Sequence, residues 1–177
     1  MTIGGAELVC HCLLIETARA GLVLVDTGIG TADVADPTRF GRTINRLLRP
    51  RRDRAETALE QVRARGFSAG DVRHIVVTHL DLDHAGGLAD FPLAAVHLHA
   101  AECFAATTGP SLTERVRYIR AQWAHLPRWQ TYADAGDDWF GFAAVRALHG
   151  LDAEVALVPL TGHSRGHSGV AVRDGDR

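Results

Sequence analysis

The sequence contains no lysine, and its 19 basic residues, all arginine, are slightly outnumbered by 21 acidic residues. The formal net charge of −2 gives no strong positive field, so we expect neither a nucleic-acid partner nor a membrane partner. No stretch approaches 18 uninterrupted apolar residues, so no transmembrane helix is expected. The opening residues lack the basic region and the long apolar region of a secretory signal peptide.

Cysteine is also scarce, with only Cys10, Cys12 and Cys103. An odd number of cysteines in a chain of 177 residues does not make a disulfide framework, so we expect a reducing compartment. Together with the missing targeting signals, this indicates a cytoplasmic protein. The hydrophobic share of 46% is sufficient for a single globular domain over residues 1–177.

Hydrophobic periodicity predicts strands and helices in the first third of the chain. The β-rich runs 7–17 and 21–26 are separated by a short segment, which is typical of a β-hairpin. Apolar residues recur at helical spacing over 40–49 and 54–65, and Pro50 separates these two predicted helices.

The middle of the chain continues this alternation. One strand should end near Thr78, and a second strand over 94–99 should lead directly into a helix over 100–108. Residues 112–125 favour a helix, and the pattern after it favours a long loop or lid.

Strand-like runs return towards the end of the chain, at 143–148, 155–160 and 169–173. Asp174 and Gly175 then resemble the turn of a hairpin whose second strand is missing. Strands with intervening helices predict a layered α/β or α+β domain, and ligands in such sheets bind beyond the carboxyl ends of strands.

A dense polar cluster follows a predicted buried strand. Residues 76–87 read VVTHLDLDHAGG and place His79, Asp81, Asp83 and His84 within six positions. The plain alternative is a solvated loop. An extended backbone would, however, direct the first three of these side chains to the same side. Without a cation the aspartates would repel each other, and a divalent metal ion removes that penalty, so we predict a metal site.

The residues between and after these polar side chains favour a tight loop around an ion. Leu80 and Leu82 would face the core and anchor the loop. Gly86 and Gly87 would permit either a close backbone approach or a positive φ.

Three segments in combination resemble the metallo-β-lactamase-fold hydrolases, most closely their lactonase and glyoxalase-II branches. VVTHLDLDHAGGL (76–88) resembles the T-H-x-H-x-D-H-x-G-G signature. LVLVDTG (22–28) is similar to an earlier strand and turn, with Asp26 as the characteristic acid. LVPLTGHSRGHSGVAV (157–172) resembles the later P-G-H-T-x-G-H segment, whose first histidine corresponds to His163.

This resemblance implies an αβ/βα sandwich with two adjacent metal ions at the edge of its sheets. His79 and His163 would bind the first metal, and Asp83 and His84 the second. Zn²⁺ suits these ligands, as do iron and manganese. Water held by the metals would become hydroxide and attack the carbonyl of a small ester, lactone or thioester substrate. Asp83 would be catalytic, orienting this hydroxide and passing a proton to the leaving group.

Two departures from the family pattern leave alternatives open. Asp81 replaces the second histidine of the signature; it can still bind the first metal, although a carboxylate there favours iron or manganese. Flavodiiron proteins carry a carboxylate at this position, so a redox protein is one alternative.

The family's bridging aspartate and final histidine lie beyond the segment equivalent to residue 173, and Asp174 and Asp176 are poor substitutes. We therefore expect a chain that lacks the C-terminal part of the domain, and a non-catalytic or truncated metal-binding domain is the other alternative.

GHSRG (162–166) also matches the G-x-S-x-G nucleophile elbow, in which Ser164 would be the nucleophile. That motif requires a strand, a sharp turn and a helix, with a histidine later in the chain. The residues after Ser164 favour a strand, and no histidine follows His167. We therefore reject a serine nucleophile and expect His167 to brace the loop around His163.

Overall fold

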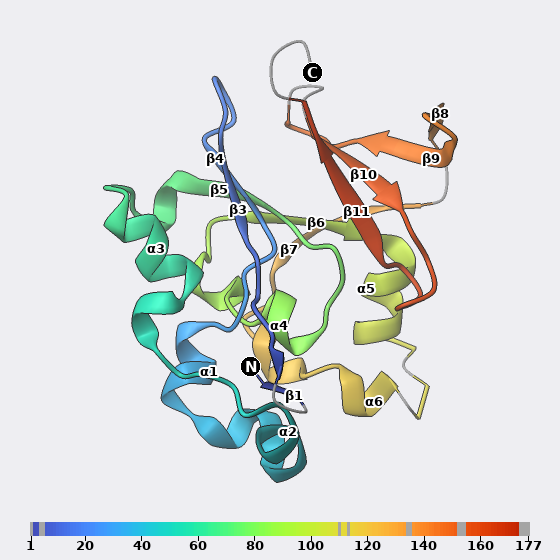
Figure 1. Cartoon of the computed structure of the whole chain (residues 1–177). Coiled ribbons are helices and arrows are strands. Elements are labelled where there is room, and N and C mark those ends of the chain that lie inside the picture. The colour runs from blue at the N-terminus through green and yellow to red at the C-terminus, as the bar shows by residue number, and fades with distance from the viewer. Residues whose placement is uncertain are drawn as a thin grey trace.

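A computed structural model describes residues 2–3, 6–109, 111–112, 114–133, 136–151 and 155–173. Its largest sheet has the strand order β3-β4-β5-β6-β7 (Figure 1). β3 is antiparallel to β4, and the other neighbouring pairs are parallel. The strands are β3 Leu13–Glu16, β4 Leu22–Val25, β5 Val72–Val76, β6 Ala95–His99 and β7 Arg128–Tyr132.

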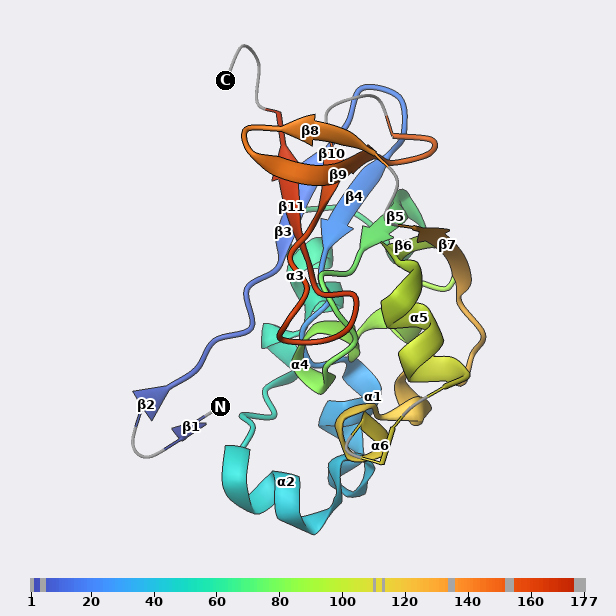
Figure 2. The ribbon, with the colours of Figure 1, turned by 90° about the vertical axis from the view of Figure 1, so that its right-hand side faces the viewer.

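A second sheet has the order β11-β10-β9-β8 and is antiparallel throughout. Figure 2 shows it above the helices, next to the five-stranded sheet. Its strands are β8 Asp137–Trp139, β9 Phe142–Ala147, β10 Val155–Pro159 and β11 Ser168–Val172. A separate two-stranded ribbon is formed by β1 Thr2–Ile3 and β2 Ala6–Glu7.

All helices of the described residues precede β7 in the chain. The α-helices are α1 Thr31–Ala35, α2 Gly41–Leu48, α3 Ala58–Ala64, α4 Leu82–Ala85, α5 Ala100–Thr107 and α6 Glu114–Arg117. Short 3₁₀ turns are η1 Pro37–Phe40, η2 Arg54–Glu56, η3 Ala69–Asp71, η4 Leu88–Asp90 and η5 Arg120–Trp123. Among the described residues there is no helix with both the length and the apolar character to cross a membrane.

The period-two alternation of strand side chains creates two cores. Leu24 and Ile75 face one side of the five-stranded sheet, where they join residues of α3 and α5 in one buried cluster. Val23 and Val76 face the opposite side, in a second cluster with Leu157 of the four-stranded sheet. The five-stranded sheet is therefore covered by helices on one face and by the second sheet on the other, which gives three of the four layers of the predicted sandwich.

Most predicted elements are confirmed, and two predictions are wrong. The hairpin, the helices over 40–49 and 100–108, and the strands near Thr78 and 94–99 are present, although the first strand begins only at Leu13. The prediction of one helix over 112–125 is wrong, because the described residues of this segment form only the short elements α6 and η5. The prediction of a long loop or lid after this segment is also wrong, since the chain there forms β7, the fifth strand of the main sheet. This edge strand is not predicted from the sequence because its residues, RWQTY, are polar and aromatic.

Helix 54–65 is interrupted at Thr57, whose hydroxyl caps the start of α3 by accepting from the Glu60 N–H. The predicted turn at Asp174 and Gly175, and the aspartate at 176, lie outside the described residues.

Candidate metal centre

The site forms where the main sheet ends, beyond β4 and β5. Asp26 directly follows β4, is 4% exposed and has a left-handed φ of 53°. Its Oδ1 accepts from the Thr78 N–H at 2.8 Å, and its Oδ2 accepts from the Thr78 hydroxyl at 2.8 Å. The same Oδ2 lies 2.7 Å from His84 Nδ1. Asp26 thus orients two residues of the neighbouring loop.

His79 is held in one ring orientation by this network. Its Nδ1 lies 2.9 Å from the Thr78 hydroxyl oxygen. Because that hydroxyl donates its single proton to the Asp26 carboxylate, its oxygen must accept from His79 Nδ1–H. The tautomer of His79 is therefore fixed, and its Nε2 carries a free lone pair. This is how metal-binding imidazoles are commonly oriented.

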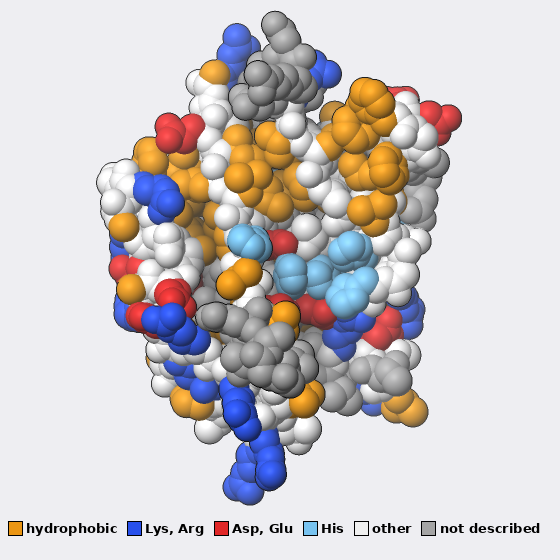
Figure 3. Space-filling view, in the orientation of Figure 1, with side chains coloured by type: hydrophobic (Ala, Val, Ile, Leu, Met, Phe, Trp, Pro, Cys, Tyr) orange, Lys and Arg blue, Asp and Glu red, His pale blue; other side chains and the backbone are white. Residues whose placement is uncertain are grey.

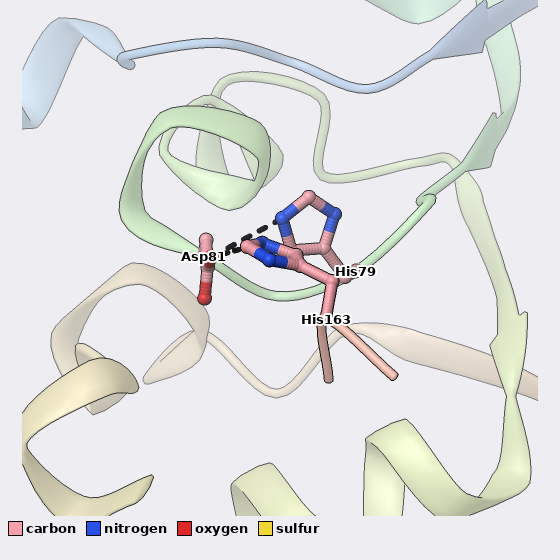
Figure 4. A group of neighbouring side chains, drawn as sticks. All are labelled: His79, Asp81 and His163. Carbon is pink, nitrogen blue, oxygen red and sulfur yellow. Dashed lines mark hydrogen bonds and ion pairs between the residues drawn. The ribbon is translucent and has the colours of Figure 1, made fainter. Parts of the chain in front are cut away.

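His79, Asp81 and His163 offer ligand atoms that all lie within 4.8 Å of one another (Figure 4). Asp81 Oδ2 is 3.2 Å from His79 Nε2 and 3.1 Å from His163 Nε2. Two ligands bound to tetrahedral zinc at about 2.1 Å are about 3.4 Å apart, so Asp81 Oδ2 lies at about such a separation from each histidine nitrogen. His163 comes from a position 82 residues after Asp81, on the loop between β10 and β11.

Arg117 also contacts Asp81. Its Nε donates to Oδ1, its Nη2 donates to Oδ2 at 2.6 Å, and its Nη1 donates to the carbonyl oxygen of His163. Burial raises the pKa of Asp81, but its contacts with His79 and Arg117 outweigh burial and hold that pKa well below its ordinary value. Asp81 is therefore kept as a carboxylate, and the guanidinium partly balances its charge.

Asp83 and His84 lie beside this group of three, on α4. His84 Nε2 is 3.8 Å from Asp83 Oδ2, and the His84 ring is 4.0 Å from the His79 ring. Burial lowers the pKa of His84, but its hydrogen bond to Asp26 and the charges of Asp26, Asp83 and Asp81 outweigh burial and raise it. Figure 3 shows histidine side chains gathered with acidic groups near the middle of one face.

The predicted extended backbone is wrong beyond Asp81. Asp81 is extended, with φ −69° and ψ 157°, but it is the N-cap of α4, so Asp83 projects from a helix. The predicted burial of the leucines is correct, because Leu80 is fully buried and Leu82 is 8% exposed.

The glycine pair permits close backbone approach and does not use a positive φ. The φ values of Gly86 and Gly87 are −60° and −90°. A Cβ on Gly86 would lie 2.6 Å from both Gly28 O and Asp33 Oδ2, and one on Gly87 would lie 2.8 Å from Thr27 O. The end of α4 thus packs directly against the turn after β4.

The loop with His163 is attached to the His79 segment at several points. The Ser168 N–H donates to the Thr78 carbonyl at 3.0 Å, which joins β11 to the end of β5. His167 Nδ1 lies 2.9 Å from the Leu160 carbonyl, so His167 braces this loop as expected. Ser164 donates to Glu102 at 2.6 Å and is followed by strand β11, which agrees with the rejection of a serine nucleophile.

The sequence prediction did not include Arg117 or Glu102. Arg117 follows no pattern that distinguishes it from other surface arginines, and it lies in a segment whose structure was predicted wrongly. Glu102 gives a weak signal, because it stands three residues after the end of β6, at the sheet edge where the site forms.

Two hollows lie in the surface near these residues. One, of about 430 Å³, is lined by Arg117 and His163 together with Ser111, Glu114 and residues 161, 162, 164 and 165. The other, of about 640 Å³, lies between residues 8–14 and α3 and is lined by none of the three clustered residues. Of these two hollows, the first is therefore the one that borders the group of three, through His163.

The curated relatives of this chain include a metallo-hydrolase and a lactonase, and both are longer than the chain. A "probable metallo-hydrolase" of Mycobacterium tuberculosis is 50% identical over the whole chain, which covers 56% of that relative. The N-acyl homoserine lactonase AttM of Agrobacterium fabrum is 29% identical over 158 residues, 89% of this chain and 57% of AttM. The chain thus spans about half the length of the curated relatives it matches.

Solved structures show the same fold. An AiiA variant of Bacillus thuringiensis with bound N-decanoyl-L-homoserine aligns with a TM-score of 0.67 at 22% identity, over 91% of this chain and 57% of AiiA. The dizinc lactonase AidC aligns with a TM-score of 0.59 at 20% identity, over 93% of this chain and 52% of AidC. The family model described as the metallo-beta-lactamase superfamily matches residues 5–175. The chain therefore belongs to the metallo-beta-lactamase superfamily.

Proposed function

We propose that this chain carries the metal centre of a hydrolase that cleaves a small lactone or a related ester or thioester. The observation that carries the proposal is the convergence of His79, Asp81 and His163, whose ligand atoms lie within 4.8 Å of one another. Two imidazole nitrogens and one carboxylate oxygen form a donor set that suits zinc and also admits iron or manganese.

The residues of the chain prepare this set for a cation. Thr78 and Asp26 fix the tautomer of His79 so that Nε2 is free. Arg117 keeps Asp81 ionised and holds its oxygen towards both histidines. When bound, a divalent cation supplies Lewis acidity and lowers the pKa of a water molecule that it binds.

Asp83 and His84 supply acid–base and further binding groups next to the three ligands. Asp26 accepts the Nδ1 proton of His84, so His84 Nε2 is directed towards Asp83 and is available as a ligand. The Asp83 carboxylate is 28% exposed, so solvent and substrate can reach it. We propose that Asp83 Oδ2 accepts a proton from the attacking water molecule and delivers that proton to the leaving oxygen.

A lactone substrate is favoured by the named relatives. Lactonases of the AttM type are similar to this chain over 89% of its length. The hollow beside His163 and Arg117 can admit a small substrate next to one of the clustered residues. The guanidinium of Arg117 lies at its wall and can attract the carboxylate that forms when a lactone ring opens.

The test is hydrolysis of a simple acyl lactone by the purified chain after zinc loading and after treatment with a chelator. Turnover that appears with zinc and disappears with the chelator is the expected result. Equal rates in both samples would contradict metal-dependent hydrolysis. Zinc binding without turnover would instead indicate a metal-binding domain that does not catalyse the reaction alone.

A further inference from the structure

Glu102 is a buried carboxylate that lies outside the proposed ligand set. It is the third residue of α5, is fully buried, and makes no ion pair among the described residues. Burying an ionisable group is costly unless hydrogen bonds compensate for the lost hydration. Its environment therefore has to supply several donors.

The two oxygens of Glu102 accept four hydrogen bonds. Oε1 accepts from the Leu80 N–H at 2.9 Å and from the Tyr118 hydroxyl at 3.1 Å. Oε2 accepts from the Ser164 hydroxyl at 2.6 Å and from the Gly166 N–H at 3.1 Å. Donors from three separate segments of the chain thus converge on one carboxylate.

These donors are chain neighbours of the residues that form the metal centre. Leu80 lies between His79 and Asp81, and Ser164 directly follows His163. Tyr118 directly follows the arginine that contacts Asp81. A shift of Glu102 would therefore move both sides of the candidate centre relative to each other.

The loop with His163 also packs directly onto the start of α5. A Cβ on Gly166 would lie 2.4 Å from the Glu102 backbone nitrogen. No side chain can separate the loop from the helix at this point, so the Gly166 N–H reaches the carboxylate without an intervening water.

We propose that Glu102 is a positioning residue that sets the spacing between His79 and His163 for a shared cation. This inference rests on the proposed metal-dependent function. Glu102 does not touch the cation itself. It holds Leu80 on one side and Ser164 and Gly166 on the other, so that the ligands stand at binding distance before any ion arrives.

The substitution Glu102→Gln tests this role with almost no change in shape. An amide has one accepting oxygen and one donating nitrogen. The hydroxyls of Tyr118 and Ser164 can rotate to accept from the new amide. The backbone N–H groups of Leu80 and Gly166 bond different carboxylate oxygens, so whichever way the amide is oriented, one of them faces another donor.

The experiment measures the zinc dissociation constant of the full 177-residue chain by competition with a chromophoric chelator. We expect E102Q to bind zinc about 10- to 100-fold more weakly than the wild type. Glu60→Gln is the matched control, because Glu60 is a helical residue whose carboxylate, among the described residues, bonds surface arginines; the zinc affinity of this variant should equal that of the wild type. The visible absorption bands of the cobalt-loaded proteins provide a second readout. These bands change when ligands are displaced, and they do not change when only the global stability falls.

Ser164→Ala covers the case in which E102Q does not fold. It removes one donor and retains the Gly166 N–H, so we expect a folded protein with about tenfold weaker zinc binding. Wild-type zinc affinity in folded E102Q, or in S164A if E102Q is unfolded, overturns the role of Glu102 while leaving the proposed function intact. A wild-type chain that binds no zinc overturns the proposed function and this inference together.

Discussion

The protein contains two groups of histidines whose neighbours differ. At the candidate centre, His79 and His163 each approach Asp81, through Nε2 atoms 3.2 and 3.1 Å from its carboxylate. Between the two sheets, His74 and His97 form a row instead, with His74 Nδ1 2.9 Å from His97 Nε2. The row continues from His97 Nδ1 to the hydroxyl of Tyr132 at 2.8 Å, which also accepts from the His149 N–H at 2.9 Å.

The electrostatics of the two groups are opposite. Burial, together with the smaller effects of the charges of His74 and His149, lowers the pKa of His97 to about 4. At the centre, carboxylates offset the burial of His84 and raise its pKa. We infer that a cluster of histidines can hold a cation only where carboxylates converge with the imidazoles. In the core row, His97 contacts His74 and Tyr132, and the imidazoles act as packed hydrogen-bonding groups.

The largest expected effect is on turnover. Asp83→Ala should reduce zinc-dependent lactone hydrolysis by about 10³-fold, because it removes the proposed proton donor. Circular dichroism should show an unchanged fold. Asp137→Ala, at an exposed aspartate of β8, is the control and should retain wild-type rates. Unchanged turnover in Asp83→Ala would remove Asp83 from the mechanism.

The core row should make the free energy of unfolding depend on pH. Histidine has an ordinary pKa of 6.5, and the fold lowers that of His97 to about 4. Between these values the unfolded chain binds one proton more than the folded chain, so stability rises with pH over this range. Urea unfolding in the presence of a chelator should show a loss of up to about 3 kcal/mol on going from pH 7 to pH 4.

His97→Gln separates this effect from the titration of carboxylates. The variant lacks the titrating ring, so its unfolding free energy should change less over the same pH range than that of the wild type. Identical pH profiles for both proteins would show that the core row does not act as described.

The next effect is on metal binding. His163→Ala should weaken zinc binding by about 100-fold, because one of three ligands is lost. His149→Ala, at an exposed histidine whose ring stacks on Tyr132, should leave the zinc affinity unchanged. Equal losses in the two variants would mean that the two histidine groups do not differ as proposed.

The smallest effect concerns the polar end of the core row. Tyr132→Phe removes the hydroxyl that contacts His97 Nδ1 and the His149 N–H. The free energy of unfolding should fall by about 1–2 kcal/mol, and zinc binding should not change. Altered zinc affinity in this variant would show that the row is coupled to the centre.

Sequence reasoning could predict the parts of the fold that depend on local periodicity. Strands β4, β5 and β6 are rich in apolar residues, and the motif that follows β5 indicates where ligands gather. The edge strand β7 could not be recognised, because an edge strand tolerates the polar residues Arg128, Gln130 and Thr131. Its place in the sheet depends on pairing with β6, which is a tertiary interaction.

The site was predictable to a similar degree. His79, Asp81 and His163 were found from motifs, and the structure brings them together. The roles of Arg117 and Glu102 depend on contacts across the fold, such as the 46 positions that separate Arg117 from His163. The prediction that Asp83 lies on an extended backbone is wrong, because Asp81 caps helix α4 at the point where the strand pattern was expected to continue.

The most direct test of the account is an anomalous difference map, measured at the zinc edge, from crystals of the zinc-loaded chain. We expect a peak about 2.1 Å from His79 Nε2, from Asp81 Oδ2 and from His163 Nε2. No peak is expected at the row formed by His74 and His97. A map with no peak among the first three residues, or with zinc bound at the core row, would contradict the account.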